Sequence, residues 1–167
     1  MSAVEPVSGR FNVVSGGHPV RAIVDYAHTP DALNHVLDTI NKIRTGNEML
    51  ITVFGCGGDR DKAKRPLMGR IASTLSDKVI FTSDNPRNED PEKIIEQIES
   101  GVPAEHFKKY ISISSRLQAI KTACQLAHKG DIILVAGKGH ETYQDIKGER
   151  LEFDDAKVLK QHLQNKN

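Results

Sequence analysis

The sequence has no excess of charge of either sign and no long apolar run. Its 23 Lys and Arg residues balance 22 Asp and Glu residues, which leaves a net charge of +1. No apolar stretch approaches the roughly 18 residues of a membrane span, and the N-terminus lacks the layout of a secretory signal. We therefore expect a cytoplasmic protein with no nucleic-acid partner and no membrane partner.

Familiar catalytic and metal-binding motifs are also missing. The two cysteines, Cys56 and Cys124, lie in a glycine-rich loop and on a predicted helix, and we interpret both as free thiols. No His or Cys residues have metal-ligand spacing, and neither a Walker-type phosphate loop nor a G-x-S-x-G nucleophile elbow occurs. The sequence therefore predicts no catalytic residue and no metal ligand in this chain.

Strand and helix patterns alternate along a chain of 167 residues, which fits one domain. Strands are predicted at 9–14, 19–24, 49–54, 78–81, 109–113 and 131–136. Helices are predicted from Pro30, around 67–75, over 92–100, after Ser115 and after the capping residue Asp154, with a turn at 15–18 and a hairpin-like piece at 145–153. This alternation predicts a Rossmann-like α/β fold, in which a mostly parallel sheet of about six strands has helices on both faces and an N-terminal hairpin.

Apolar spacing also predicts the buried face of each helix. In the first helix, the residues expected to face the core are Leu33, Val36, Leu37, Ile40 and Ile43. In the second they are Leu67, Met68, Ile71, Ala72 and Leu75. In the fourth they are Leu117, Ile120, Cys124 and Ala127.

Four polar or glycine-rich loops leave the predicted strand ends. They span 25–28, 55–60, 84–87 and 137–141. In open α/β sheets, ligands bind outside the carboxyl ends of the strands, so these loops predict a binding face. The connections at the other ends, 45–48 and 128–130, are plain by comparison.

The loop Asp84-Asn85-Pro86-Arg87 carries an anionic, an amide and a cationic group within four residues. Pro86 stiffens it by restricting Asn85 to extended backbone angles. This display suits a small ligand with both an ammonium and a carboxylate. The alternative is an ordinary loop whose arginine pairs with a surface carboxylate.

The other loops have two interpretations each. The glycines of 55–58 suit phosphate binding or tight turning. Four cations near a helix start, where the helix dipole disfavours them, suggest an anionic ligand or a solvated charged turn; they are Arg60, Lys62, Lys64 and Arg65. Lys138 and His140, between flexible glycines, are more often structural in such positions.

Five motifs together resemble the C-terminal domain of the Mur ligases. They are 9–11, 25–33, 54–66, 84–87 and 137–141, and they occur in order with family-like spacing from about residue 5 to the end. Within that family, the Asp-Asn-Pro-Arg motif resembles the branch that adds meso-diaminopimelate to UDP-MurNAc-L-Ala-D-Glu in peptidoglycan synthesis. The resemblance implies an ATP-dependent ligase that uses Mg²⁺ and activates the glutamate carboxylate as an acyl phosphate.

The resemblance also implies roles for individual residues. The substrate-binding residues, which contact meso-diaminopimelate, are Arg60, Asp84, Asn85, Pro86, Arg87, Gly137 and Glu141. Among them, Asp84, Asn85 and Glu141 are expected at the distal ammonium, and Arg60 and Arg87 at the two carboxylates. The residues that contact ATP are Arg10, Asp25, Tyr26 and His28, with Asp25 at the ribose, Arg10 at the phosphates and the two rings near the adenine.

The family's phosphate loop, Mg²⁺ ligands and modified lysine belong to a central domain, and its UDP group is held mainly by an N-terminal domain. We therefore expect residues 9–167 to be an excised C-terminal domain that folds alone without catalysing alone. Residues 1–8 are then a lead-in or an artificial edge. Two alternatives remain: a ligase that adds lysine or another amino acid, and a stand-alone module that binds an amino acid or a nucleotide.

Overall fold

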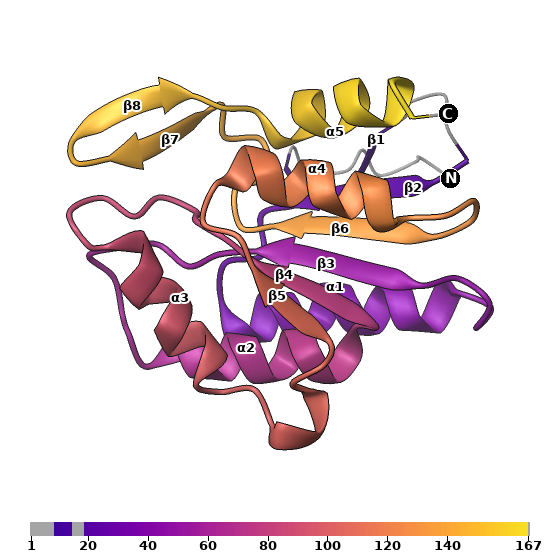
Figure 1. Ribbon diagram of the computed structural model, residues 1–167, viewed down its shortest axis with the longest axis horizontal. Coiled ribbons are helices and arrows are strands. Elements are labelled where there is room, and N and C mark those ends of the chain that lie inside the picture. The colour runs from indigo at the N-terminus through magenta and orange to yellow at the C-terminus, as the bar shows by residue number, and fades with distance from the viewer. Residues whose placement is uncertain (1–8, 15–18, 167) are drawn as a thin grey trace, which may run out of the picture.

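The computed structural model describes residues 9–14 and 19–166 (Figure 1). The expected lead-in at 1–8 and the expected tight turn at 15–18 lie outside the described residues. The strands are β1 (Asn12–Val14), β2 (Arg21–Asp25), β3 (Leu50–Phe54), β4 (Lys78–Phe81), β5 (Tyr110–Ser112), β6 (Ile132–Ala136), β7 (Tyr143–Ile146) and β8 (Glu149–Glu152). The helices are α1 (Pro30–Ile43), α2 (Lys64–Leu75), α3 (Pro91–Glu99), α4 (Arg116–Leu126) and α5 (Asp155–Gln164), with a short 3₁₀ turn at Ala104–His106.

A six-stranded sheet forms the centre of the molecule in the order β1-β2-β6-β3-β4-β5. All neighbours pair in parallel except β1, which is antiparallel to β2. The central strands β3 and β6 are buried along their whole length, as expected from their almost entirely apolar sequences. The predicted α/β fold and the N-terminal strand pair are confirmed.

Helices cover both faces of the sheet (Figure 1). One apolar cluster joins the sheet to α1, α2 and α3 through residues such as Leu37, Met68 and Ile95. The other joins it to α4 and α5, for example through Ile120 and Leu159. Both clusters run along the sheet, so the described residues share one layered core.

Two of the predicted helix starts are confirmed in detail, whereas α2 begins at Lys64, before the predicted 67. Thr29 caps α1 by accepting from Ala32 N, and Pro30 takes the first helical position. Asp154 caps α5 in the same way, by accepting from Ala156 N and Lys157 N. Local side-chain chemistry therefore sets where these elements begin.

Three apolar residues expected in the core are exposed instead: Ile43, Leu67 and Leu117. Each lies in the first or last turn of its helix. The buried stripe of α2 instead includes Gly69, where a Cβ would lie 2.0 Å from the backbone oxygen of Ile98. Apolar spacing predicted Met68 and Ala72 in this stripe correctly but missed Gly69, because close contact between α2 and α3 selects a glycine there.

Strands β7 and β8 form a separate antiparallel hairpin, near the one predicted at 145–153. It projects beyond the carboxyl ends of the parallel strands (Figure 1). A β-bridge joins Ile146 of this hairpin to Arg87, in the loop after β4. The hairpin is therefore attached to one of the four predicted binding loops.

Candidate functional site

All four predicted loops meet at one edge of the sheet and line a cavity of about 330 Å³. We call this cavity the charged cavity. The first loop contributes Tyr26 and His28, and the other three contribute six of the seven predicted substrate residues: Arg60, Asp84, Asn85, Arg87, Gly137 and Glu141. The seventh, Pro86, lines a neighbouring hollow behind the loop together with Ser83 and Ile146. Pro86 therefore shapes the loop from the far side.

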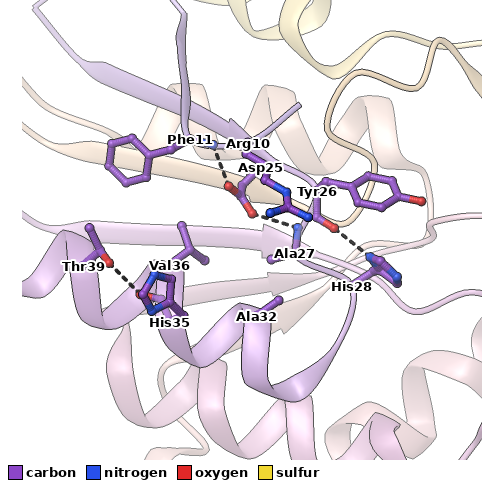
Figure 2. Close-up of a pocket in the computed structure, with 10 residues that line it drawn as sticks. All are labelled: Arg10, Phe11, Asp25, Tyr26, Ala27, His28, Ala32, His35, Val36 and Thr39. Carbon is purple, nitrogen blue, oxygen red and sulfur yellow. Dashed lines mark hydrogen bonds between the residues drawn. The ribbon is translucent and has the colours of Figure 1, made fainter. Parts of the chain in front are cut away.

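A second cavity, of about 440 Å³, lies beside β2 and α1 (Figure 2). We call it the α1 cavity. All four residues predicted to bind ATP line it, namely Arg10, Asp25, Tyr26 and His28. His35 and Thr39 of α1 also line it, and the sequence did not single them out. Because Tyr26 and His28 line both cavities, the two hollows share a wall.

The Asp25 carboxylate fixes the backbone around the α1 cavity. Its Oδ1 accepts from Phe11 N at 2.6 Å and its Oδ2 accepts from Ala27 N at 2.8 Å, as Figure 2 shows. His28 Nδ1 lies 2.9 Å from the backbone oxygen of Tyr26. Since a carbonyl only accepts, that nitrogen carries a proton, and Nε2 of a neutral ring remains an acceptor facing outward.

Arg87 occupies an unusual backbone conformation. Its φ is 52°, which is uncommon for a side chain of this size. Two hydrogen bonds to the hairpin hold it there: Arg87 N donates to Asp145 O at 3.0 Å, and Lys147 N donates to Arg87 O at 2.8 Å. The hairpin thus maintains a conformation that the loop alone would not favour.

The Arg87 guanidinium faces the charged cavity with donors to spare. Nη1 donates to Gly58 O at 2.9 Å, and Nε lies 3.9 Å from Asp145 Oδ2. Among the described residues, Nη2 has no hydrogen-bond partner. The arginine therefore makes an ion pair, as the alternative interpretation required, but this pair is long and leaves donors for a ligand.

Lys138 is a buried cation that the sequence did not assign to the site. Its side chain is fully buried, and Nζ donates to Asn85 Oδ1 and to Tyr143 O at 2.8 Å. The same nitrogen lies 3.2 Å from Asp84 Oδ1 and 3.8 Å from Glu141 Oε1. Burial lowers the pKa of Lys138, and the charge of Asp84 partly opposes that shift.

Asp84 keeps one acceptor free. Its Oδ1 is buried and lacks a well-aligned hydrogen bond, although the Lys138 ammonium is close enough for electrostatic attraction. Buried polar atoms without a hydrogen bond are rare and call for an explanation. The ion pair with the Lys138 ammonium, 3.2 Å away, supplies one.

The predicted basic cluster divides into cavity-facing and structural members. Arg60 and Lys64 line the charged cavity, and Lys64 Nζ donates to His28 O at 2.9 Å. Arg65 does not face a ligand, because its side chain is fully buried and its Nη2 donates to Glu89 Oε2 at 2.6 Å and to Gly57 O at 2.8 Å. Lys62 also pairs with Glu89, at 3.5 Å.

Glu89 links the glycine-rich loop to the loop after β4. Besides its ion pair with Arg65, its Oε2 accepts from Asp59 N at 2.7 Å. The hydrogen bond from Arg65 lowers the pKa of Glu89 to about 2. Two loops that line the charged cavity are thus fastened together by a charge-assisted network.

The glycines at 57 and 58 allow these loops to approach each other. A Cβ at Gly58 would lie 1.8 Å from Pro86 O, and one at Gly57 would lie 2.9 Å from Arg87 Nη1. The N–H of Gly58 already donates to Asn85 O at 2.8 Å. Close loop packing therefore explains these two glycines better than phosphate binding does.

The described residues also bear on the predicted thiols, metal sites and membrane spans. Cys56 and Cys124 are free and buried, and burial raises their pKa values to about 12 and about 11. Over 9–14 and 19–166, no three His, Cys, Asp or Glu side chains are placed to hold a metal ion. Within the same ranges, no helix has the length and apolarity needed to cross a membrane.

Comparison with known proteins identifies the family. Residues 9–139 match the family described as Mur ligase, glutamate ligase domain. The chain belongs to the Mur ligase family. The predicted resemblance is thereby confirmed.

Two relatives of this Mur ligase domain carry the same name. The UDP-N-acetylmuramoyl-L-alanyl-D-glutamate--2,6-diaminopimelate ligase of Bacteroides thetaiotaomicron is 55% identical over 161 residues, which are 96% of this chain and 33% of that protein. The ligase of the same name from Syntrophomonas wolfei is 50% identical over 166 residues, covering 99% of this chain and 34% of that protein. The chain thus spans about a third of the length of these relatives.

Solved structures show the same fold. A structure of a ligase with that name has a TM-score of 0.85 and 43% identity, covering 96% of this chain and 32% of the other. A folylpolyglutamate synthase/dihydrofolate synthase from Yersinia pestis, complexed with AMPPNP and Mn, has a TM-score of 0.58 and 25% identity, covering 79% of this chain and 28% of the other.

Proposed function

We propose that this chain is the C-terminal, amino-acid-binding domain of a cytoplasmic, ATP-dependent ligase that adds meso-diaminopimelate to UDP-MurNAc-L-Ala-D-Glu. The names of its relatives support this assignment. The observation that carries it is the charged cavity, whose lining includes both Arg60 and Arg87 and the carboxylates of Asp84 and Glu141. A cavity with cations and carboxylates suits an amino acid that bears carboxylates and ammonium groups.

Arg87 accounts for the choice of meso-diaminopimelate over lysine in this proposal. Diaminopimelate differs from lysine by a second carboxylate, which the free donors of Arg87 can bind. Lysine would leave that guanidinium without its anion, and sites built around a polar group reject analogues that lack it. Arg60 serves the other carboxylate, Asp84 and Glu141 serve the distal ammonium with Asn85 beside them, and Gly137 and Pro86 shape the cavity.

The α1 cavity is assigned to part of ATP. In this proposal Asp25 holds the ribose, Arg10 reaches the phosphates, and Tyr26 and His28 lie near the adenine. The described residues do not fit a Mg²⁺ site. The Mg²⁺ that neutralises the phosphates is therefore assigned to the central domain of the parent enzyme, which also carries the phosphate loop.

In this proposal the chain positions the substrates and supplies no catalytic group. The acyl phosphate forms on the D-Glu carboxylate from ATP, and the amine of the incoming amino acid displaces phosphate to form an amide bond. Because the two cavities share Tyr26 and His28, the amine would be held beside the nucleotide. Holding reactants in line supplies a large part of the rate in such transfers. We assign no catalytic residue to this chain.

The test is an amino-acid panel with the full-length enzyme. Ligation of UDP-MurNAc-L-Ala-D-Glu would be followed with meso-diaminopimelate, lysine and other amino acids as acceptors, by separating the nucleotide products. We expect diaminopimelate to be preferred. A preference for lysine would contradict the specificity, and a gene without central and N-terminal domains upstream would favour a stand-alone binding module.

A further inference from the structure

The buried Lys138 contacts Asp84 and Asn85 but does not itself line the charged cavity. Its Nζ is 2.5 Å from Asn85 Oδ1, 2.8 Å from Tyr143 O and 3.2 Å from Asp84 Oδ1. The ammonium thus donates hydrogen bonds to Asn85 and Tyr143, and Asp84 Oδ1 lies beside it as an ion-pair partner. Lys138 does not line the charged cavity, so any effect on a ligand passes through its neighbours there, which are Asp84, Asn85 and, at 3.8 Å, Glu141.

The side-chain amide of Asn85 has a single consistent orientation. Lys138 Nζ and the backbone N–H of Asp145, at 3.0 Å, approach the same side-chain atom of Asn85. Both groups can only donate, so that atom must be the oxygen. The NH₂ group therefore takes the other position. Asn85 lines the charged cavity, and among the described residues its Nδ2 has no hydrogen-bond partner.

We propose that Lys138 is a positioning residue for amino-acid selectivity, which turns Asn85 so that its NH₂ group faces a ligand carboxylate beside Arg87. The distal ammonium is then left to Asp84 and Glu141. This inference rests on the proposed function, and it changes one role that the family resemblance implied, since Asn85 was expected at the ammonium.

The arrangement divides the charged cavity into two chemical halves. Arg60, Arg87 and the Asn85 NH₂ group supply donors, whereas Asp84 and Glu141 supply acceptors. Without the Lys138 ammonium, only the Asp145 N–H would hold the Asn85 oxygen, and the Asp84 carboxylate would lose the cation beside it. A neutral side chain at 138 would therefore weaken this separation of hydrogen-bond donors from acceptors.

The first test is Asn85→Asp in the full-length ligase. This change keeps the oxygen that accepts from Lys138 and Asp145, and it replaces the NH₂ group with a second oxygen. We expect the KM for meso-diaminopimelate to rise about 30-fold or more and the preference over lysine to fall, because an oxygen would now face the ligand carboxylate. The KM for ATP should stay within about threefold. An unchanged or lower KM for diaminopimelate would overturn the inference.

The second test is Lys138→Met, with Lys129→Met as the matched control. Lys129 is exposed at the opposite end of the sheet, so the control removes the same charge away from the site. We expect Lys138→Met to raise the KM for diaminopimelate about 10-fold or more and to leave the KM for ATP within about threefold. Equal effects on both constants, or a loss of thermal stability alone, would show a merely structural lysine.

The two tests separate this inference from the proposed function. If Lys138→Met does not fold, Asn85→Asp still tests the Asn85 orientation on which the inference depends, because both donors to the oxygen of residue 85 remain. Failure of the proposed function would appear earlier, as a wild-type ligase that does not add diaminopimelate. Failure of the inference would appear only in the variants, as a KM for diaminopimelate that does not respond.

Discussion

At the residue scale, the buried charged side chains show what the sequence could and could not predict about the site. Polar residues at the strand ends predicted where the charged cavity lies, because parallel strands bring their carboxyl ends to one edge of the sheet. The sequence alone could not show that Arg65 and Lys138 are fully buried. That outcome depends on Glu89, Asn85 and other partners far away in the sequence.

Replacing Arg87 by Ala in the full-length ligase should weaken binding of the amino acid selectively. A charge-assisted pair contributes about 2 kcal/mol, which corresponds to about a 30-fold rise in the KM for diaminopimelate. The KM for ATP should change much less, because Arg87 does not line the α1 cavity. Arg70→Ala, on an exposed part of α2, is the control. Equal changes in both constants would show that Arg87 is structural.

Stability in acid should depend on Glu89. Its pKa in the folded chain is lowered to about 2 from an ordinary value of 4.5. Because the folded pKa is depressed, its contribution is present above about pH 4.5 and is lost as the pH falls toward 2. Urea unfolding should therefore show Glu89→Gln less stable than the wild type near pH 7, with the difference shrinking near pH 3. A difference independent of pH would contradict this account.

At the element scale, local signals predicted the strands and helix starts well. Continuous apolar runs identified β3 and β6, and Thr29 and Asp154 marked two helix starts. The sequence also indicated a hairpin near β7 and β8. Its attachment to Arg87 could not be predicted, since those hydrogen bonds join backbone groups that carry no sequence signal.

Gly58→Ala should disturb the contact between two binding loops. The added Cβ would lie 1.8 Å from Pro86 O, so a backbone must move. We expect a loss of about 2–3 kcal/mol in the free energy of unfolding, measured by urea titration. Gly46→Ala is the control: no atom lies within 4 Å of its Cβ, although its φ of 99° adds strain of its own. A smaller loss for Gly58→Ala than for the control would argue against close packing.

At the scale of the whole molecule, one sheet joins two apolar clusters over the described residues. This arrangement predicts that the 167-residue chain folds without the rest of the ligase. Urea unfolding should be one cooperative transition, with the far-ultraviolet signal of the backbone and the near-ultraviolet signal of the three tyrosines coinciding. Two separate transitions would show that the clusters fold independently.

The wall shared by the two cavities has a consequence for how this domain tolerates change. Tyr26 and His28 border both hollows, and their rings meet edge to face with centroids 4.6 Å apart. Resizing either ring would therefore alter both compartments together. A compound that occupied both cavities would contact Tyr26 and His28. If the cavities bind the two substrates as proposed, mutations at these positions would be poor routes to resistance, because they would also weaken the binding of both substrates.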